Sequence, residues 1–455
     1  LNDIKIVDGS GGPMLFAATR GNGWLSAYDL GGVAGDTTLD QQWRIAPHLL
    51  QLETTDLVLR NVAGTQQLYM AGLNSSGLTG VRLDSNGVGN AIDGSITYTA
   101  SGRNLSGLTE MELIGDGNTG LGALRNGGLV HISFGSGNTL NVSNISQGSA
   151  MQGERATGIT SATHDGQTYA FVTYQGEDTV SMFRQGANGA MTHINDVDAS
   201  DGFWVDRPGA LAVTSASDGK LYVVVAGSGS DSLSTFSVTP QGMVPVDHLV
   251  DSLGTRFADA SHVTSVTVGG QNFVLAAGSD MGVSMFTVLP GGRLQHIDAM
   301  PANAATPLRG ITSIDAMSTP DGLRFWVSTE GAPYLAEFSV ALPNLGINLG
   351  ASANGSTLDG RFGDDILSGG AGADRLNGNF GNDILLDGAG ADTLRGDGGR
   401  DTFVLTEDGA RDVIQDFEMG FDRIDMTDFS QTGAFGQMTI VSQSWGAEFR
   451  LGADV

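Results

Sequence analysis

The chain lacks cysteine, has few basic residues and contains no long apolar run, and each absence excludes a class of protein. Without cysteine there is no disulfide, no zinc–thiolate site and no cysteine nucleophile. Only 22 basic residues stand against 50 acidic ones, and the net charge of −28 argues against binding to nucleic acid or to anionic membranes. No apolar stretch reaches the roughly 18 residues that a transmembrane helix needs.

Glycine and acidic residues are abundant instead. The 69 glycines are about twice the usual share of ~7%. Hydrophobic residues make up 40% of the chain, which is enough to build a core. Clustered carboxylates in a protein without thiols point to a hard cation, above all calcium.

One sequence repeat of about 50 residues recurs from residue 1 to about residue 341. It consists of an apolar strand, a turn rich in Gly, Asn and Asp, and a strand that alternates apolar and small polar residues. Its most recognisable strand recurs seven times, anchored at Leu25, Leu78, Val130, Val180, Leu233, Val283 and Leu335. The spacings are 53, 52, 50, 53, 50 and 52 residues. Each unit contains four predicted strands, and four antiparallel strands repeated radially describe a β-propeller blade.

The blade sequences resemble those of lactonase-type seven-bladed propellers. FVTYQGEDTVSMF from Phe171 and LYVVVAGSGSDSLSTF from Leu221 carry this resemblance. It implies an all-β fold over residues 1–343, a seven-bladed propeller, and it carries no catalytic residue across. The first and last units look incomplete, so we expect the two ends of the chain to share one blade, with residues 4–7 or 345–349 as the closing strand.

A shorter and stricter period of nine begins near residue 354. The recurring positions are Gly363, Gly372, Gly381, Gly390 and Gly399, then Asp365, Asp374, Asp383, Asp392 and Asp401, then Leu367, Leu376, Leu385, Leu394 and Phe403. This is the G-G-x-G-x-D-x-U-x pattern, and it resembles the calcium-binding nonapeptide repeat of RTX (hemolysin-type) proteins.

The RTX resemblance implies a parallel β-roll with Ca²⁺ as its cofactor. Glycine permits the tight turns, and the aspartate carboxylates and turn carbonyls face the cation. Two nonapeptides form one coil, so each repeat stacks on the repeat 18 residues later. We therefore predict three complete calcium sites, between Asp365 and Asp383, between Asp383 and Asp401, and between Asp374 and Asp392.

The segment after the roll resembles the cap of serralysin-type C-terminal domains. Its matching frame is Asp412-x-Ile414-x-Asp416-Phe417 followed by Gly420-x-Asp422-x-Ile424-Asp425. In that family the region carries a signal for type I secretion. We thus predict three regions, a propeller at 1–343, a calcium-binding roll at 344–404, and a cap with a secretion signal at 405–455.

No familiar catalytic motif is present. The seven histidines include no H-E-x-x-H pair, and neither a G-x-S-x-G elbow nor a phosphate-binding loop occurs. Five arginines recur before predicted innermost strands, at Arg103, Arg155, Arg207, Arg256 and Arg309. They predict a basic funnel for an anion, completed by Glu110, Glu112, Glu154, Asp206, Asp259 and His262, unless each arginine only ties down loop carbonyls.

These patterns predict a secreted calcium-binding protein, located outside the cell or at its surface. Its propeller would act as a recognition or scaffolding module for an anionic small molecule, a glycan or a protein. Two alternatives remain open at this point: an extracellular lactonase-like hydrolase that uses the central funnel, and a structural surface-layer or matrix component. Fold alone does not choose among them.

Overall fold

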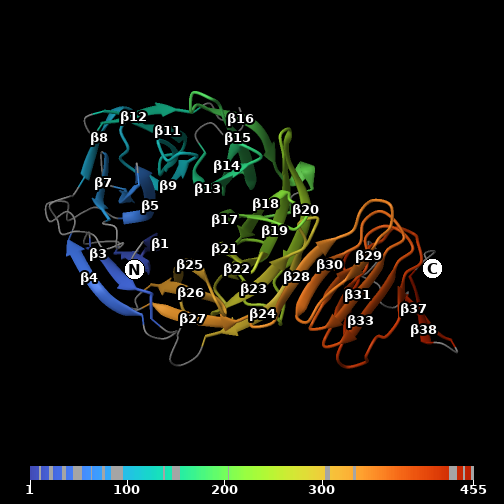
Figure 1. Ribbon diagram of the computed structural model, residues 1–455. Helices are drawn as coiled ribbons and strands as arrows, with labels where there is room; N and C mark the ends of the chain where they lie inside the picture. The colour runs from blue at the N-terminus through green and yellow to red at the C-terminus, as the bar shows by residue number, and fades with distance from the viewer. Residues whose placement is uncertain are drawn as a thin grey trace. The chain divides into compact units, whose positions relative to one another are not determined.

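The computed structural model forms two compact units (Figure 1). It describes residues 1–9, 12–19, 24–32, 37–44, 54–62, 64–73, 77–83, 96–136, 139–145, 154–202, 204–302, 308–330, 335–429, 438–443 and 446–451. The first unit comprises residues 1–216, 220–268 and 272–341, and the second comprises the remainder. Among the described residues, no helix is long and apolar enough to span a membrane.

The first unit is a ring of seven blades, as the seven sequence repeats predicted, and the strands within each blade pair antiparallel (Figure 1). The first three blades are β1 (Asp3–Gly9), β2 (Gly12–Ala18), β3 (Trp24–Asp29) and β4 (Thr38–Arg44); β5 (Thr54–Val62), β6 (Thr65–Gly72), β7 (Gly77–Arg82) and β8 (Ile96–Gly102); and β9 (Leu108–Ile114), β10 (Thr119–Leu124), β11 (Leu129–Phe134) and β12 (Thr139–Asn144). The next three are β13 (Ala156–His164), β14 (Gln167–Tyr174), β15 (Thr179–Gln185) and β16 (Met191–Val197); β17 (Pro208–Ser215), β18 (Leu221–Gly227), β19 (Ser232–Thr239) and β20 (Gly242–Val250); and β21 (His262–Val268), β22 (Gln271–Ala277), β23 (Gly282–Val288) and β24 (Leu294–Pro301). The seventh is β25 (Ile311–Thr319), β26 (Gly322–Thr329) and β27 (Ala336–Ala341), and a short 3₁₀ helix, η1 (Ala199–Asp201), follows β16.

Local sequence explains the strands and turns of a blade. The β18 sequence LYVVVAG is rich in β-branched residues and is buried throughout, so it forms a central strand. Between β13 and β14, Asp165 and Gly166 have φ of 49° and 74°, the pair of positive values that a two-residue type I′ hairpin turn requires. Apolar clusters between neighbouring blades hold the ring together, and the one between blades 7 and 1 contains Ile4, Leu15 and Trp326.

Ring closure differs from the prediction that the two chain ends share a blade. Strand β1 pairs with β2 of its own blade, and residues 345–350 pair with a strand of the second unit. Side chains close the ring instead, because Arg324 of β26 donates from Nη1 to the carbonyls of Leu30 and Gly32 at 2.8 and 3.2 Å. The same guanidinium donates to Glu337 Oε1 at 2.6 Å. A buried arginine network thus replaces the expected strand exchange.

The outer strands of blades 2 and 3 pair with each other. Thr139 of β12 lies opposite Thr99 of β8, and the parallel pairing continues to Val142 and Gly102. These two blades therefore form one eight-stranded sheet.

The second unit is a parallel β-roll. One sheet contains β28 (Leu345–Gly350), β30 (Asp364–Ser368), β32 (Ile384–Leu386), β34 (Thr402–Val404) and β36 (Arg423–Asp425); the other contains β29 (Thr357–Asp359), β31 (Arg375–Phe380), β33 (Thr393–Gly398) and β35 (Val413–Ile414). A separate hairpin of β37 (Met438–Gln443) and β38 (Gly446–Leu451) follows. The stack continues past residue 404, since β35 and β36 come from the segment predicted to be a cap.

The nonapeptide apolar residues form the core of the roll. Leu367 pairs with Leu385 and Leu385 with Phe403, so successive coils are 18 residues apart. Leu376 pairs with Leu394 on the other sheet. All five side chains are fully buried in one cluster. This register places the repeat aspartates in columns along the roll.

Candidate functional site

Each nonapeptide aspartate lies at or next to the start of a roll strand. Asp383 and Asp401 immediately precede β32 and β34, and Asp374 and Asp392 precede β31 and β33. Asp365 is the second residue of β30. Because the strands stack in parallel at 18-residue intervals, the aspartates form one column along each sheet.

Backbone hydrogen bonds join the aspartates of each column. The N–H of Asp365 donates to Asp383 Oδ1 at 2.8 Å, and the N–H of Asp383 donates to Asp401 Oδ1 at 2.9 Å. In the other column the N–H of Asp374 donates to Asp392 Oδ1 at 2.6 Å. The segment after residue 404 extends both columns. The N–H of Asp401 donates to Asp422 Oδ1 and the N–H of Asp392 donates to Asp412 Oδ1, both at 3.0 Å.

The second carboxylate oxygen distinguishes the middle of the columns from their ends. At the ends, Oδ2 of Asp365, Asp374 and Asp422 accepts a backbone N–H from four residues earlier. In the middle, Oδ2 of Asp383, Asp392 and Asp401 is buried and has no hydrogen-bond partner among the described residues. An ionised oxygen buried without a partner is costly, so these three atoms mark places where a cation would be stabilised.

Glycine makes room for these oxygens. A Cβ added to Gly378 would lie 2.2 Å from Asp383 Oδ2, and one added to Gly396 would lie 2.1 Å from Asp401 Oδ2. Gly381 has a φ of 139°, a backbone conformation that other residues rarely adopt. The glycine-rich half of the repeat therefore shapes the space next to the carboxylates.

Burial and crowding perturb the carboxylates. Burial first, and then the charges of Asp401 and Asp365, raise the pKa of Asp383 to about 7. Burial, with smaller contributions from neighbouring acids, raises the pKa of Asp392 and of Asp401 to about 6. A divalent cation would relieve both causes at once.

The donor set suits calcium and excludes a site made of side chains alone. No three His, Asp or Glu side chains of the described ranges converge as metal ligands would. Ca²⁺ takes six to eight oxygens and accepts backbone carbonyls as readily as carboxylates. Two carboxylates from stacked coils and the carbonyls of the glycine-rich turns would have to supply these oxygens.

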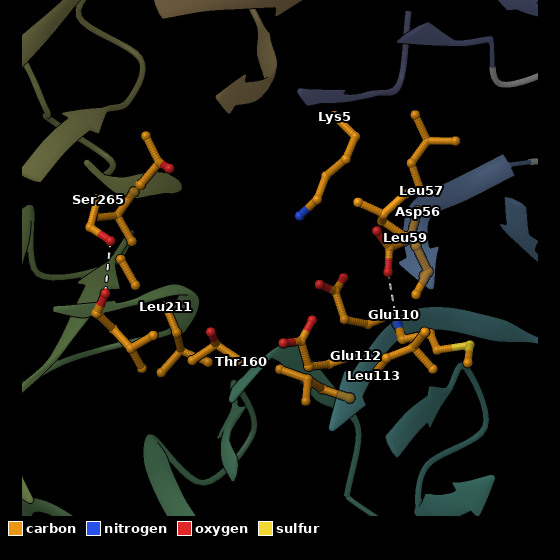
Figure 2. Close-up of a pocket in the computed structure, with 17 residues that line it drawn as sticks. Lys5, Asp56, Leu57, Leu59, Glu110, Glu112, Leu113, Thr160, Leu211 and Ser265 are labelled. Atoms are coloured by element: carbon orange, nitrogen blue, oxygen red, sulfur yellow. Dashed lines mark hydrogen bonds between the residues drawn. The ribbon is translucent and has the colours of Figure 1, made fainter. Parts of the chain in front are cut away.

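A second polar site lies in the ring of the first unit. Six inner strands contribute residues to a cavity of about 390 Å³, whose charged lining residues are Lys5, Asp56, Glu110 and Glu112 (Figure 2). Burial raises the pKa of Glu110 well above its usual range, and the charges of Asp56, Asp3 and Glu112 add to the effect. Both glutamates are among the residues that the sequence predicts for the funnel. Lys5 and Asp56 are not, although their spacing of 51 residues on inner strands was the available signal.

The five arginines are placed outside this cavity. Arg103, Arg155, Arg207 and Arg309 are exposed, Arg256 is half-buried, and none of them lines it. Glu154, Asp206, Asp259 and His262 do not line it either. Arg103 donates to the Asn144 side chain, and Arg207 Nη2 donates to the Ser228 carbonyl at 3.3 Å. Anion binding by these arginines stays a prediction.

Arg207 and Arg256 occupy different positions in their blades. Arg207 has a φ of 51°, and its N–H donates to Asp178 Oδ1 at 2.8 Å. The equivalent residue of the next blade is Asp259, with a φ of 49° and an N–H that donates to Asp231 Oδ1 at 2.6 Å. Arg256 lies three residues before Asp259, so it is not the structural equivalent of Arg207, although it still precedes the inner strand β21.

Comparison with solved structures returns proteins of low sequence identity. A putative 6-phosphogluconolactonase from Bacteroides uniformis is 14% identical, with 71% of this chain and 94% of that chain covered and a TM-score of 0.46. The periplasmic gluconolactonase of Pseudomonas aeruginosa is 16% identical, covering 72% and 91%, with a TM-score of 0.49. The hydrazine synthase of Kuenenia stuttgartiensis is 13% identical, with 74% of this chain and 95% of that chain covered and a TM-score of 0.49. No activity is assigned from these likenesses.

Comparison with protein families concerns the second unit. No curated protein matches the chain. Residues 352–385 and 377–407 match the model of the RTX calcium-binding nonapeptide repeat, which contains four copies. The five nonapeptide aspartates lie within these matched segments, and Asp412 and Asp422 follow them. The roll is thus built from RTX repeats, a repeat type that binds calcium.

Proposed function

We propose that the chain is an exported protein whose roll folds on binding calcium outside the cell and whose propeller is a recognition or scaffolding module. The observation that carries this proposal is the set of three buried oxygens without partners, on Asp383, Asp392 and Asp401. One such oxygen falls to each of the three calcium sites expected between stacked coils.

Charge explains why folding of the roll would depend on the ion. Residues 359–428 contain 15 Asp and 2 Glu against 6 Arg, a net charge of −11. Stacking brings carboxylates of successive coils together, and one buried apolar side chain per nonapeptide is a small core to set against that repulsion. Each bound divalent cation reverses the sign of the local interaction, so the binding free energy becomes folding free energy.

The same dependence supports export. RTX repeats are typical of secreted proteins. Extracellular calcium modules have dissociation constants of about 10⁻⁴–10⁻³ M. A roll of this kind would stay unfolded at cytosolic calcium concentrations and fold after type I secretion, when it meets the higher concentration outside.

A calcium titration of the full chain tests this proposal. Far-ultraviolet circular dichroism in chelator, followed by added calcium, should show a gain of β-structure on top of the constant signal of the propeller. Asp383→Ala should shift the midpoint to higher calcium, and the exposed Asp321→Asn of the propeller is the matched control. A spectrum that calcium does not change would refute the proposal.

A further inference from the structure

The inner strands of the propeller bring six charged side chains together. Five are acids and one is a lysine: Asp3 and Lys5 from β1, Asp56 from β5, Glu110 and Glu112 from β9, and Asp315 from β25. Each of the other four acids influences the pKa of Lys5 or Glu110 through its charge. The cluster therefore has an excess of four negative charges when all six groups are ionised.

Four of the acids have structural hydrogen bonds to neighbouring blades. Asp3 accepts the Leu57 N–H at 2.8 Å, and Asp56 accepts the Met111 N–H at 2.9 Å. Asp315 accepts the Ile6 N–H at 2.8 Å. Glu112 accepts from the Ser161 hydroxyl at 2.8 Å. These acids join successive inner strands, so their structural role in the ring is enough to explain their presence.

Hydrogen bonds between inner strands do not explain the presence of Glu110 and Lys5. Among the described residues neither side chain has a hydrogen-bond or ion-pair partner, although both lie deep in the ring. Figure 2 shows Lys5 extending from β1 and Glu110 from β9 into the same cavity. Glu110 is half-buried, and a carboxylate confined in a cavity without a partner is costly, so this unpaired glutamate aimed into a cavity points to a ligand that would pair with it.

The cavity and its charge define the class of that ligand. An excess of carboxylates repels anions and attracts cations. A metal ion does not fit, because no three acids of the described residues converge as metal ligands would. A cavity of about 390 Å³ is of the size that small organic molecules occupy.

We propose that the propeller cavity binds a small organic ammonium compound, with Glu110 as the counter-ion of its ammonium group. Glu112 and Asp56 lie beside Glu110 in the lining and add to the attraction. Lys5 is the internal cation that partly balances the same acids, and it competes with the ligand for them. The proposal rests on the recognition role of the propeller given above and names its ligand class.

Isothermal titration of the full chain in saturating calcium tests the proposal, with putrescine as the probe. Glu110→Gln removes the counter-ion and should weaken binding by roughly tenfold or more. Lys5→Met removes the competing cation and should tighten binding. Glu177→Gln, in the exposed turn between β14 and β15, is the matched control and should change nothing.

Two further probes separate the ligand classes. Gluconate tests for an anion site, where Lys5→Met would weaken binding, and 4-aminobutyrate tests for a zwitterion site, where both variants would weaken it. Either pattern, or putrescine binding that Glu110→Gln leaves unchanged, overturns the proposal, as does an absence of putrescine binding. If Lys5→Met does not fold, Glu110→Gln and Glu112→Gln decide the question.

Failure of this inference is distinguishable from failure of the proposed function. The same samples, titrated with calcium and followed by far-ultraviolet circular dichroism, report on the roll alone. A normal calcium response without amine binding contradicts only the ligand class of the propeller.

Discussion

The N–H of Asp365 donates to Oδ1 of Asp383, which lies 18 residues later, at 2.8 Å, while the other oxygen of Asp383 is buried without a partner. One oxygen of the carboxylate thus belongs to the backbone ladder of the roll. The other is left for a cation, and the two roles can be separated by substitution.

Calcium binding should be more sensitive to substitution of an aspartate in the middle of a column than to substitution of one at its end. Asp383→Ala should raise the calcium midpoint of the full chain by about tenfold or more, because Asp383 would serve two stacked sites. Asp365→Ala should raise it less, since both Asp365 oxygens already accept backbone N–H groups at 2.5 Å. Calcium titrations followed by circular dichroism compare the two, and equal midpoints would contradict the shared-site model.

Substitution of a glycine that is not itself a calcium ligand should raise the calcium midpoint almost as much as substitution of Asp383. Gly378→Ala places a Cβ 2.2 Å from Asp383 Oδ2 and should raise the calcium midpoint by displacing that oxygen. Gly350→Ala is the matched control, because nothing lies within 4 Å of its added Cβ. Identical titration curves for the two variants would show that the space beside Asp383 is not part of the site.

The arginine that closes the ring should be among the most sensitive residues of the propeller. Arg324→Met removes the guanidinium that pairs with Oε1 of the half-buried Glu337 and should lower the free energy of unfolding by about 3–5 kcal/mol. The double variant Arg324→Met with Glu337→Gln should lower the free energy of unfolding by less than Arg324→Met alone. The exposed Arg309→Met should stay within about 0.5 kcal/mol of the parent. Urea denaturation in saturating calcium measures all three.

The acids of the ring should make the propeller less stable as the pH rises. Burial and the neighbouring Asp56 raise the pKa of Asp3 to about 7 from an ordinary value of 3.8. The folded chain therefore holds this proton more tightly than the unfolded chain does between these two pH values, and the resulting stability is lost as the pH rises through about 7. The raised pKa values of Asp56, Glu110, Glu112 and Asp315 act in the same direction.

Asp3→Asn tests this pH dependence. Asparagine imitates the protonated carboxyl, so the difference in melting temperature between pH 5 and pH 8 should shrink. Asp321→Asn should leave the difference unchanged. A parent protein whose propeller gains stability between pH 5 and pH 8 would contradict the assignment.

The periodic features of the fold could be predicted from the sequence. Seven strands at spacings of 50–53 residues gave seven blades, and a period of nine gave the register of the roll, because both patterns repeat one local solution. The columns of Asp365, Asp383 and Asp401 follow from that register alone.

What the sequence could not show depends on contacts between distant segments. Lys5 and Asp315 are 310 residues apart, and only closure of the ring brings them near each other. The equivalence of Asp259 with Arg207 likewise depends on a positive φ and on a hydrogen bond to Asp231, which spacing does not reveal. The parallel pairing of β8 with β12 joins two blades that sequence repeats treat as separate.

The hydrogen bonds to the column aspartates tie successive coils of the roll in both directions. In both columns an earlier coil donates its N–H to the carboxylate of a later coil, up to Asp412 and Asp422. The backbone bonds beside them run the opposite way, since the N–H of Thr402 donates to the carbonyl of Asp383 and the N–H of Arg423 donates to the carbonyl of Asp401. Each aspartate residue therefore donates to one coil and accepts from another. A coil on its own lacks both a donor and an acceptor, so these bonds form only when neighbouring coils are in place together.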